Sequence, residues 1–170
     1  GRGAKDLWAV GDAGVLRYPG SAWQKVETPA SYPLNSVTVT SDGNVWALGE
    51  GGMVRYDGKE WVEVGASQEG APTVLFGGPS GPYVAGSKGV WRFDGKAWAS
   101  VLSRTEALAG YTAASDEVWA LVKGEEVRHW NGVGWRRLVT GSQLQLRAAW
   151  SRNGEVVAVG DGGAIVHFRP

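Results

Sequence analysis

Short apolar runs alternate with clusters of glycine and polar residues along the chain, most clearly in the stretch from Val37 to Val64. Runs of about four apolar or β-branched residues between turn residues are typical of β-strands, whereas helices need longer periodic segments. The stretch therefore predicts four strands. We name them A, B, C and D in chain order: Val37–Thr40, Val45–Leu48, Met53–Tyr56 and Trp61–Val64.

Tight turns are predicted between these strands. Ser41-Asp42-Gly43 separates A from B, and the glycines around Glu50 between B and C permit the positive φ of a reversal. Asp57-Gly58, between C and D, is the dipeptide that a two-residue hairpin prefers. Because such short hairpins join only antiparallel neighbours, the four strands should form a meander.

The same unit recurs along the whole chain. Its strand B anchors are spaced 38, 37, 36 and 38 residues apart: Trp8, Trp46, Tyr83, Trp119 and Val157. A fixed period of about 37 residues indicates a repeat architecture. We therefore expect residues 1–170 to form a single domain of like units.

Two further columns repeat at the junction of strands C and D. Strand C ends in a cation and an aromatic residue, at Arg17-Tyr18, Arg55-Tyr56, Arg92-Phe93, His129-Trp130 and His167-Phe168. A tryptophan then opens strand D four times, at Trp23, Trp61, Trp98 and Trp135. Neighbouring residues of a strand face opposite sides. We expect the aromatic side chains to pack between sheets and the cations to lie on the outer or rim side.

Sheets of this kind bury both faces only by stacking on each other, and stacking around an axis gives a β-propeller. The fold class we predict is all-β, a β-propeller of four-stranded antiparallel meander blades. Parallel solenoids do not use two-residue hairpins, and an immunoglobulin-like sandwich does not repeat five times at this period. One segment, Thr105–Leu108, could form a helical turn.

The strand count leaves a half-unit excess, with five B and five C strands but four A and four D strands, 18 in all. Five blades would leave one without its inner strand and another without its outer strand. Alternatively, the last A strand could join the first B, C and D strands, giving four complete blades. A third option is that two chains join edge to edge. We favour five blades, with the closing blade completed by the termini or by a second copy.

Composition narrows the function classes. The chain has 43% hydrophobic residues, 27 glycines and ten tryptophans, which fits many short strands with bulky side chains between thin layers. Net charge is zero, so no global field favours nucleic acid. No apolar run approaches the roughly 18 residues of a membrane helix. There is no cysteine, and no metal or cofactor motif.

The unit [DN]-x-W-A-[VL]-G-x-G-G-x-x-[RH]-[YFW]-[DN]-G-x-x-W resembles the repeats of secreted bacterial propeller proteins. It is also similar to BNR (Asp-box) and Ycf48-like photosystem-assembly propellers. The resemblance implies the propeller fold and a secreted or periplasmic protein. The Asp-box is shortened here to Asp57–Trp61 and Asp94–Trp98. Sialidases share such propellers, but their arginine triad and tyrosine nucleophile have no counterpart, so no catalytic residue is carried over.

Candidate ligand-binding residues come from the turns and from aromatic residues outside the repeat columns. The B–C turns carry Asp12, Glu50 and Asp161, which could ring the axis and bind a cation or a polyol, although acidic residues also simply solvate turns. The same turns carry Ser87, Lys88 and Glu125. Trp91 and Trp150 lie outside the columns. His129 and His167 alternate with arginine, and we interpret them as rim cations.

Two function classes follow. The first is a non-enzymatic scaffold that binds a protein or glycan through its loops, or assembles with itself through open blade edges. The second is a carbohydrate-active propeller enzyme, a glycoside hydrolase or lyase, which needs converging carboxylates. The predicted A strands carry threonines but no acid. This favours the scaffold.

Overall fold

The computed structural model describes residues 1, 3–65, 71–78, 81–112, 117–124, 126–139, 141, 144–152 and 155–168. Eighteen strands and one 3-10 turn, η1 (Asp161–Gly163), make up the regular structure of these residues. The strands are β1 (Leu7–Gly11), β2 (Gly14–Tyr18), β3 (Gln24–Val26), β4 (Leu34–Val39), β5 (Val45–Gly49), β6 (Gly52–Tyr56), β7 (Trp61–Val64), β8 (Pro72–Gly78), β9 (Gly81–Gly86), β10 (Gly89–Phe93), β11 (Trp98–Ser103), β12 (Ala107–Thr112), β13 (Glu117–Val122), β14 (Glu126–Asn131), β15 (Trp135–Val139), β16 (Leu146–Arg152), β17 (Glu155–Gly160) and β18 (Ile165–Phe168).

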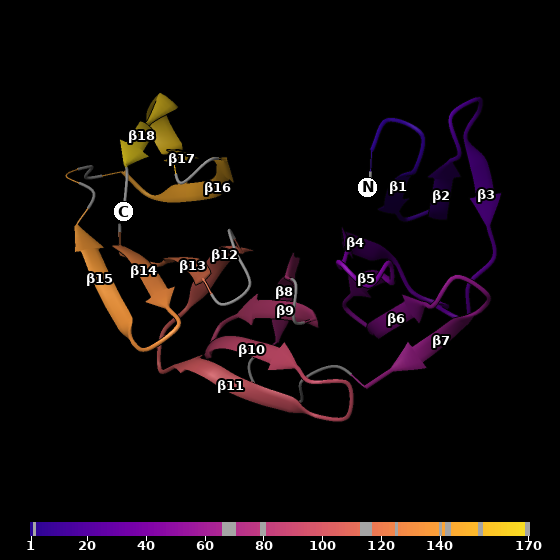
Figure 1. Cartoon of the computed structure of the whole chain (residues 1–170), viewed down its shortest axis with the longest axis horizontal. Coiled ribbons are helices and arrows are strands. Elements are labelled where there is room, and N and C mark those ends of the chain that lie inside the picture. Colours follow the sequence, from indigo (N-terminus) through magenta and orange to yellow (C-terminus); the bar gives the residue numbers. More distant parts are fainter. Residues whose placement is uncertain are drawn as a thin grey trace.

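The strands form five antiparallel sheets in chain order, which are the blades of a β-propeller (Figure 1). Blade 1 is β1–β3, blade 2 is β4–β7, blade 3 is β8–β11, blade 4 is β12–β15 and blade 5 is β16–β18. The A strands β4, β8, β12 and β16 lie innermost, and the D strands lie on the outside (Figure 1). The predicted fold class is confirmed, and among the described residues blade 1 has no A strand and blade 5 no D strand.

The five blades follow an arc whose open side lies between blade 5 and blade 1 (Figure 1). Among the described residues, β16 pairs with β17, and blades 1 and 5 remain separate three-stranded sheets. The arrangement with four complete blades was therefore wrong, as was completion of the closing blade by the termini of one chain. Completion by a second copy stays a prediction.

The B–C turn of blade 2 is a tight reversal as predicted, but the C–D turn is longer than predicted. In blade 2, β5 pairs with β6 from Val45↔Tyr56 to Gly49↔Gly52, which leaves a B–C turn of two residues. The C–D connection there has four residues, 57–60, because the Asp57 carboxylate accepts hydrogen bonds from the backbone N–H groups of Lys59 (2.8 Å) and Glu60 (3.0 Å). Asp94 and Asn131 make the same turn in blades 3 and 4. The predicted two-residue C–D hairpin was therefore wrong.

The helical turn expected at Thr105–Leu108 was also wrong. Ala107 begins β12 and pairs with Val122, with a bulge before Ala109. Each of the four A strands has a register shift near its start. The ladder with strand B therefore decides the conformation, and the local helix propensity does not.

Apolar side chains fill the junctions between successive blades. Val45 and Ala47 of β5 pack toward blade 1, whereas Trp46 and Leu48 of the same strand pack toward blade 3. The C–D aromatic residues of blades 2 to 4 also lie in these junctions, as predicted: the Trp8 ring is 5.6 Å from that of Tyr56. Each inner blade therefore buries both of its faces.

Arg17 and Arg55 of strand C lie in these junctions too, which corrects the rim position expected for them. Arg17 pairs in register with Trp8, and its guanidinium lies 5.1 Å from the centroid of the Trp8 ring. Arg55 lies 5.7 Å from the Trp46 ring in the same way. A cross-strand pair shares one face, and both faces of an inner blade are covered by neighbours. The cation therefore lies at least partly buried against the strand B aromatic residue.

The two end faces of the arc expose apolar side chains that inner blades bury. Blade 1 presents Leu16 and Trp23, which are 40% and 49% exposed. Blade 5 presents Trp150 and Ile165, which are 58% and 73% exposed. These are faces on which no further blade of the described chain packs (Figure 1).

Candidate binding site on the third blade

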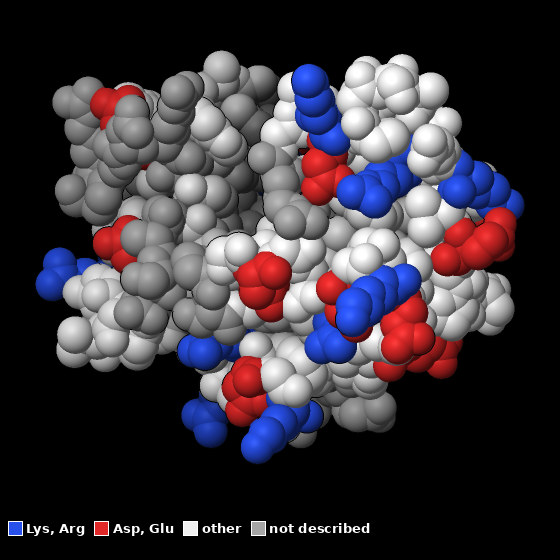
Figure 2. Space-filling view, turned by 45° about the vertical axis from the view of Figure 1, so that its right-hand side comes forward, with Lys and Arg blue, Asp and Glu red and all other residues white. Residues whose placement is uncertain are grey.

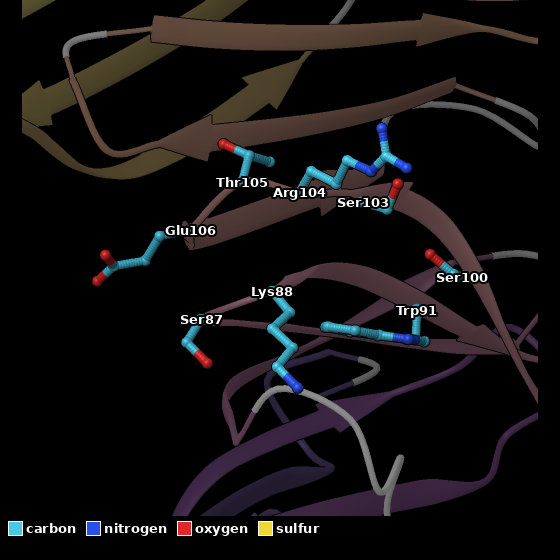
Figure 3. A pocket seen from close by; sticks show the side chains of 8 residues that line it. All are labelled: Ser87, Lys88, Trp91, Ser100, Ser103, Arg104, Thr105 and Glu106. Carbon is cyan, nitrogen blue, oxygen red and sulfur yellow. The ribbon is translucent and has the colours of Figure 1, made fainter.

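A cavity of about 390 Å³ opens on blade 3, on the face of the propeller that carries the B–C turns and the D–A connectors. We call this the BC face, and the opposite one the CD face. Residues from β10, β11 and the two adjoining loops line the cavity (Figure 3): Ser87, Lys88, Trp91, Ser100, Ser103, Arg104, Thr105 and Glu106. The volume is within the range of small-molecule and side-chain pockets.

A β-bulge shapes the floor of this cavity. In the β10–β11 pair, Val90 faces Leu102 but Trp91 faces Ser100, so β11 holds one extra residue, Val101. An extra residue bends its strand and turns its side chains. Ser100 and Ser103 both reach the cavity wall as a result (Figure 3).

Two cationic side chains belong to the lining of the cavity, one on each side. Lys88 stands on the B–C turn to one side of the Trp91 indole, with its ammonium group pointing away from Arg104, and Arg104 extends along the opposite wall beside Ser103 (Figure 3). Glu106 points away from Trp91, and its carboxylate is held 2.9 Å from the ammonium group of Lys123 (Figure 3). The lining therefore carries a net positive charge and several hydroxyl groups.

Arg104 is held in an unusual backbone conformation. Its φ of +60° is in the left-handed region, which costs a non-glycine residue about 1 kcal/mol or more. The strain lies in the D–A connector that delivers the guanidinium to the cavity.

The sequence-predicted site residues are only partly brought together. Ser87, Lys88 and Trp91 line the cavity, but Trp91 is 4% exposed and contributes mainly to the core between blades 2 and 3. Ser100, Ser103, Arg104, Thr105 and Glu106 were missed. The chain pattern did carry a signal, because the consecutive apolar residues Val101 and Leu102 break the alternation of strand D.

The three acidic turn residues lie on different blades and do not form a joint site. Asp12 borders a separate hollow of about 280 Å³ on blade 1, and Glu50 is exposed on the B–C turn of blade 2. Asp161 accepts two hydrogen bonds from Arg147, at 2.9 and 2.8 Å, and these lower the pKa of the Asp161 carboxyl. Among the described residues, no three His, Asp or Glu side chains are placed to hold a metal ion. Glu125 lies outside them.

The two histidines differ in their surroundings. His129 is 7% exposed and stacks on the Trp119 ring at 3.8 Å, so its interpretation as a rim cation was wrong. Burial lowers the pKa of His129, although Glu117 opposes this effect. The His167 side chain is half exposed and lies 3.5 Å from a Glu155 oxygen. Neither histidine lines the blade 3 cavity.

Trp150 is exposed on the open face of blade 5, away from the blade 3 cavity. Charges of both signs are mixed over the face shown in Figure 2, without a broad patch of one sign. In the part of the chain that the structure describes, no helix is long and apolar enough to cross a membrane.

The chain is similar in structure to known propellers. No protein-family model matches it, and no curated protein matches it significantly. Ycf48 from Cyanidioschyzon merolae aligns with 100% of this chain at 15% identity, with a TM-score of 0.75, and a structure of Ycf48 bound to D1 peptide aligns with 97% at 17% identity, with a TM-score of 0.71. The β-propeller domain of Cps50 (Swd1) from Myceliophteria thermophila aligns with 98% at 12% identity, with a TM-score of 0.76.

An enzyme is also among the similar structures. A catalytically inactive variant of virginiamycin B lyase from Staphylococcus aureus, with quinupristin, aligns with 99% of this chain at 10% identity, with a TM-score of 0.62. The chain spans 68% and 61% of the two Ycf48 chains, 62% of the Cps50 domain and 71% of the lyase. Identities this low establish the propeller fold alone.

Proposed function

We propose that this protein is a non-enzymatic propeller that binds an acidic segment of a partner protein on the BC face of blade 3. The observation that carries the proposal is the cavity of about 390 Å³ with Lys88 and Arg104 in its lining and its one lining carboxylate, Glu106, held by Lys123. Ammonium and guanidinium groups bind carboxylates through charge-assisted hydrogen bonds.

The hydroxyl groups favour a peptide over a bare anion. Ser87, Ser100, Ser103 and Thr105 add donors and acceptors around the two cations, which suits the alternating N–H and C=O groups of an extended backbone. Trp91 is 4% exposed, so its indole face is not a free platform for a sugar ring. The Ycf48 structure with D1 peptide supports peptide binding on this fold, as an analogy.

The alternative class, a carbohydrate-active propeller enzyme, gains no support from this cavity. Glycoside hydrolysis generally uses two carboxylates on either side of the bond that is cleaved. Glu106 is the only acid among the described lining residues, and Lys123 already holds it. Release of reducing sugar from a glycan panel would reverse the assignment.

Selection from a phage-displayed random peptide library, followed by fluorescence anisotropy on the selected peptides, tests the proposal. We expect peptides rich in Asp and Glu, whose binding weakens as salt is raised. The double variant Lys88→Glu/Arg104→Glu should weaken binding by at least about tenfold. Lys59→Glu/Lys96→Glu, on exposed C–D turns of the CD face, is the matched control and should have little effect. Equal binding by the two double variants, or peptides without an acidic excess, would refute the site.

Assembly through the ends of the arc is a second candidate, and the exposed end faces favour it. Trp23 on blade 1 and Ile165 on blade 5 occupy positions that neighbouring blades cover partly or fully at the inner junctions. Association of these faces between copies should make the sedimentation mass rise with concentration, and Trp23→Lys should suppress the rise. A mass of 18.0 kDa at all concentrations would exclude self-association.

A further inference from the structure

The first two blade junctions have a common aromatic arrangement near the CD face. A strand B tryptophan lies between the cation of its own blade and the C–D aromatic residues of the next blade. Trp8 has Arg17 on one side, at 5.1 Å, and the rings of Tyr56 and Trp61 at 5.6 and 5.8 Å. At the next junction Trp46 has Arg55 at 5.7 Å and the ring of Phe93 at 5.5 Å.

The junction between blades 3 and 4 departs from this arrangement because Tyr83 stands where the tryptophan would be. The Tyr83 ring stacks on Phe76 of the inner strand, with centroids 5.3 Å apart and planes at 13°. It reaches the backbone of Gly78, where an added Cβ would come within 2.9 Å of the ring. The smaller ring is therefore turned toward the A strands and leaves the outer part of the junction empty.

A cavity of about 300 Å³ occupies the vacated space. Its lining comes from both blades: Tyr83, Arg92, Ser100, Val101, Val118, Trp130 and Trp135. Trp135 donates its indole N–H to the Val101 carbonyl at 2.6 Å, which fixes one wall in place. The rings of Trp130 and Trp135 lie 5.8 Å apart and are half-buried, so the cavity is open to solvent.

Arg92 supplies the charge in this cavity. It pairs in register with Tyr83, as Arg17 does with Trp8, but the Tyr83 ring stacks on Phe76 instead. Its Nε is buried and, among the described residues, has no hydrogen-bond partner. No carboxylate is among the described residues that line the cavity. A buried N–H without an acceptor favours a ligand that brings one.

We propose that this cavity binds a planar aromatic or heteroaromatic carboxylate. The ring takes the place of the missing indole against Trp130 and Trp135, and the carboxylate accepts hydrogen bonds from Arg92. Lys88 and Arg104, which bind the acidic peptide in the function proposed above, are not part of this site. Ser100 borders both cavities and is left unchanged in the test.

Indole-3-carboxylate is the probe, with indole and tryptamine as neutral and cationic analogues of similar shape. In ¹⁵N-labelled protein, the indole N–H signals of Trp130 and Trp135 report binding at the cavity walls. We expect saturable shifts with a dissociation constant on the order of 0.1 mM, as for other small ligands of this size. Indole should bind about tenfold more weakly, and tryptamine more weakly still, because neither supplies a carboxylate.

Two substitutions decide the assignment. Tyr83→Trp should fill the cavity with the protein's own indole and abolish binding. Arg92→Gln should weaken binding of indole-3-carboxylate about tenfold and bring it to the level of indole. Arg55→Gln is the matched control, since the Trp46 ring already fills its junction.

The proposal is overturned if folded wild-type protein shows no saturation at about 10 mM probe. It is also overturned if Arg92→Gln binds as well as Arg55→Gln, a comparison that holds even where Tyr83→Trp fails to fold. Unchanged binding by folded Tyr83→Trp would place the ligand elsewhere. Loss of peptide binding by Lys88→Glu/Arg104→Glu leaves this site intact, so the two proposals fail separately.

Discussion

Thr40→Val tests how the strand B tryptophan of blade 2 is held in its junction. Thr40 is 3% exposed, and its Oγ1 accepts a hydrogen bond from the Trp46 indole N–H at 3.2 Å. The same hydroxyl donates to the Asp42 carboxylate at 2.6 Å. Valine keeps the shape but leaves the buried indole N–H without this acceptor. An unsatisfied buried donor costs about 1–3 kcal/mol, and we expect this loss of unfolding free energy at neutral pH.

A double-mutant cycle separates the hydrogen bond from packing. Trp46→Phe removes the donor together with part of the ring that packs against Phe93, and should cost about 1–3 kcal/mol. If the bond couples the two residues, the double variant should be less destabilised than the sum by about 1 kcal/mol.

The acid range gives a second readout of the same contact. Burial tends to raise the pKa of Asp42, but hydrogen bonds from Thr40 and Asn44 outweigh it and hold that pKa below its usual value. A lowered folded-state pKa stabilises the protein above the unfolded value of about 3.9, and this stabilisation is lost as the pH falls below it. Thr40→Val removes one of these hydrogen bonds. The stability difference from wild type should therefore be smaller in acid than at neutral pH.

Urea unfolding followed by circular dichroism, at neutral pH and near the Asp42 titration, measures these differences. Thr38→Val is the control, because Thr38 of β4 lies in register with Trp46 of β5, and this substitution should cost less than about 0.5 kcal/mol. Zero coupling in the cycle, or equal effects of Thr38→Val and Thr40→Val, would refute the reasoning.

Three other changes follow from contacts of the described residues. Burial lowers the pKa of His129, so its contribution to stability is present above an unfolded value of about 6.5 and lost as the pH falls below it. His129→Phe can keep the stack on Trp119, and its melting temperature should therefore change less with pH across this range than that of the wild type. Arg104 has a φ of +60°, which glycine adopts without strain. Arg104→Gly should therefore be more stable than Arg104→Ala by about 1 kcal/mol in urea unfolding, and equal stability would argue against strain. The Glu126 side chain is 14% exposed and contacts Arg128 and Arg137. Glu126→Gln should therefore cost about 1–3 kcal/mol of unfolding free energy. This cost is below the range for a fully buried pair because the Arg137 side chain is 63% exposed. A loss under about 0.5 kcal/mol would contradict this.

Strand order and blade composition could be predicted because they depend on local signals. The apolar runs and glycine turns recur at a fixed period, and each hairpin constrains only its neighbours. The length of the C–D turn could not be read in this way. Asp57-Gly58 suits a two-residue hairpin, but an aspartate side chain can also cap its own backbone two and three residues on, and that interaction lengthened the turn.

The position of the cations was missed for a geometric reason. Adjacent residues such as Arg55 and Tyr56 do face opposite sides, as expected, but neither side of an inner blade is an outer surface. The face of β6 that carries Arg55 is covered by the strand B partner Trp46 and the next blade. Which contacts form across a junction depends on the stacking of whole sheets, and no single unit contains that information.

Both candidate sites lie where blade 3 departs from the repeat, and this follows from how a repeat protein is built. Where the columns are kept, side chains of the two blades fill the junction, as the Trp46 ring does between Arg55 and Phe93. At Tyr83 a smaller ring leaves a cavity, and at Trp91 a bulge in β11 opens another. A packed junction has no room for a ligand, so in such a fold the exceptions to the pattern are where binding sites can arise.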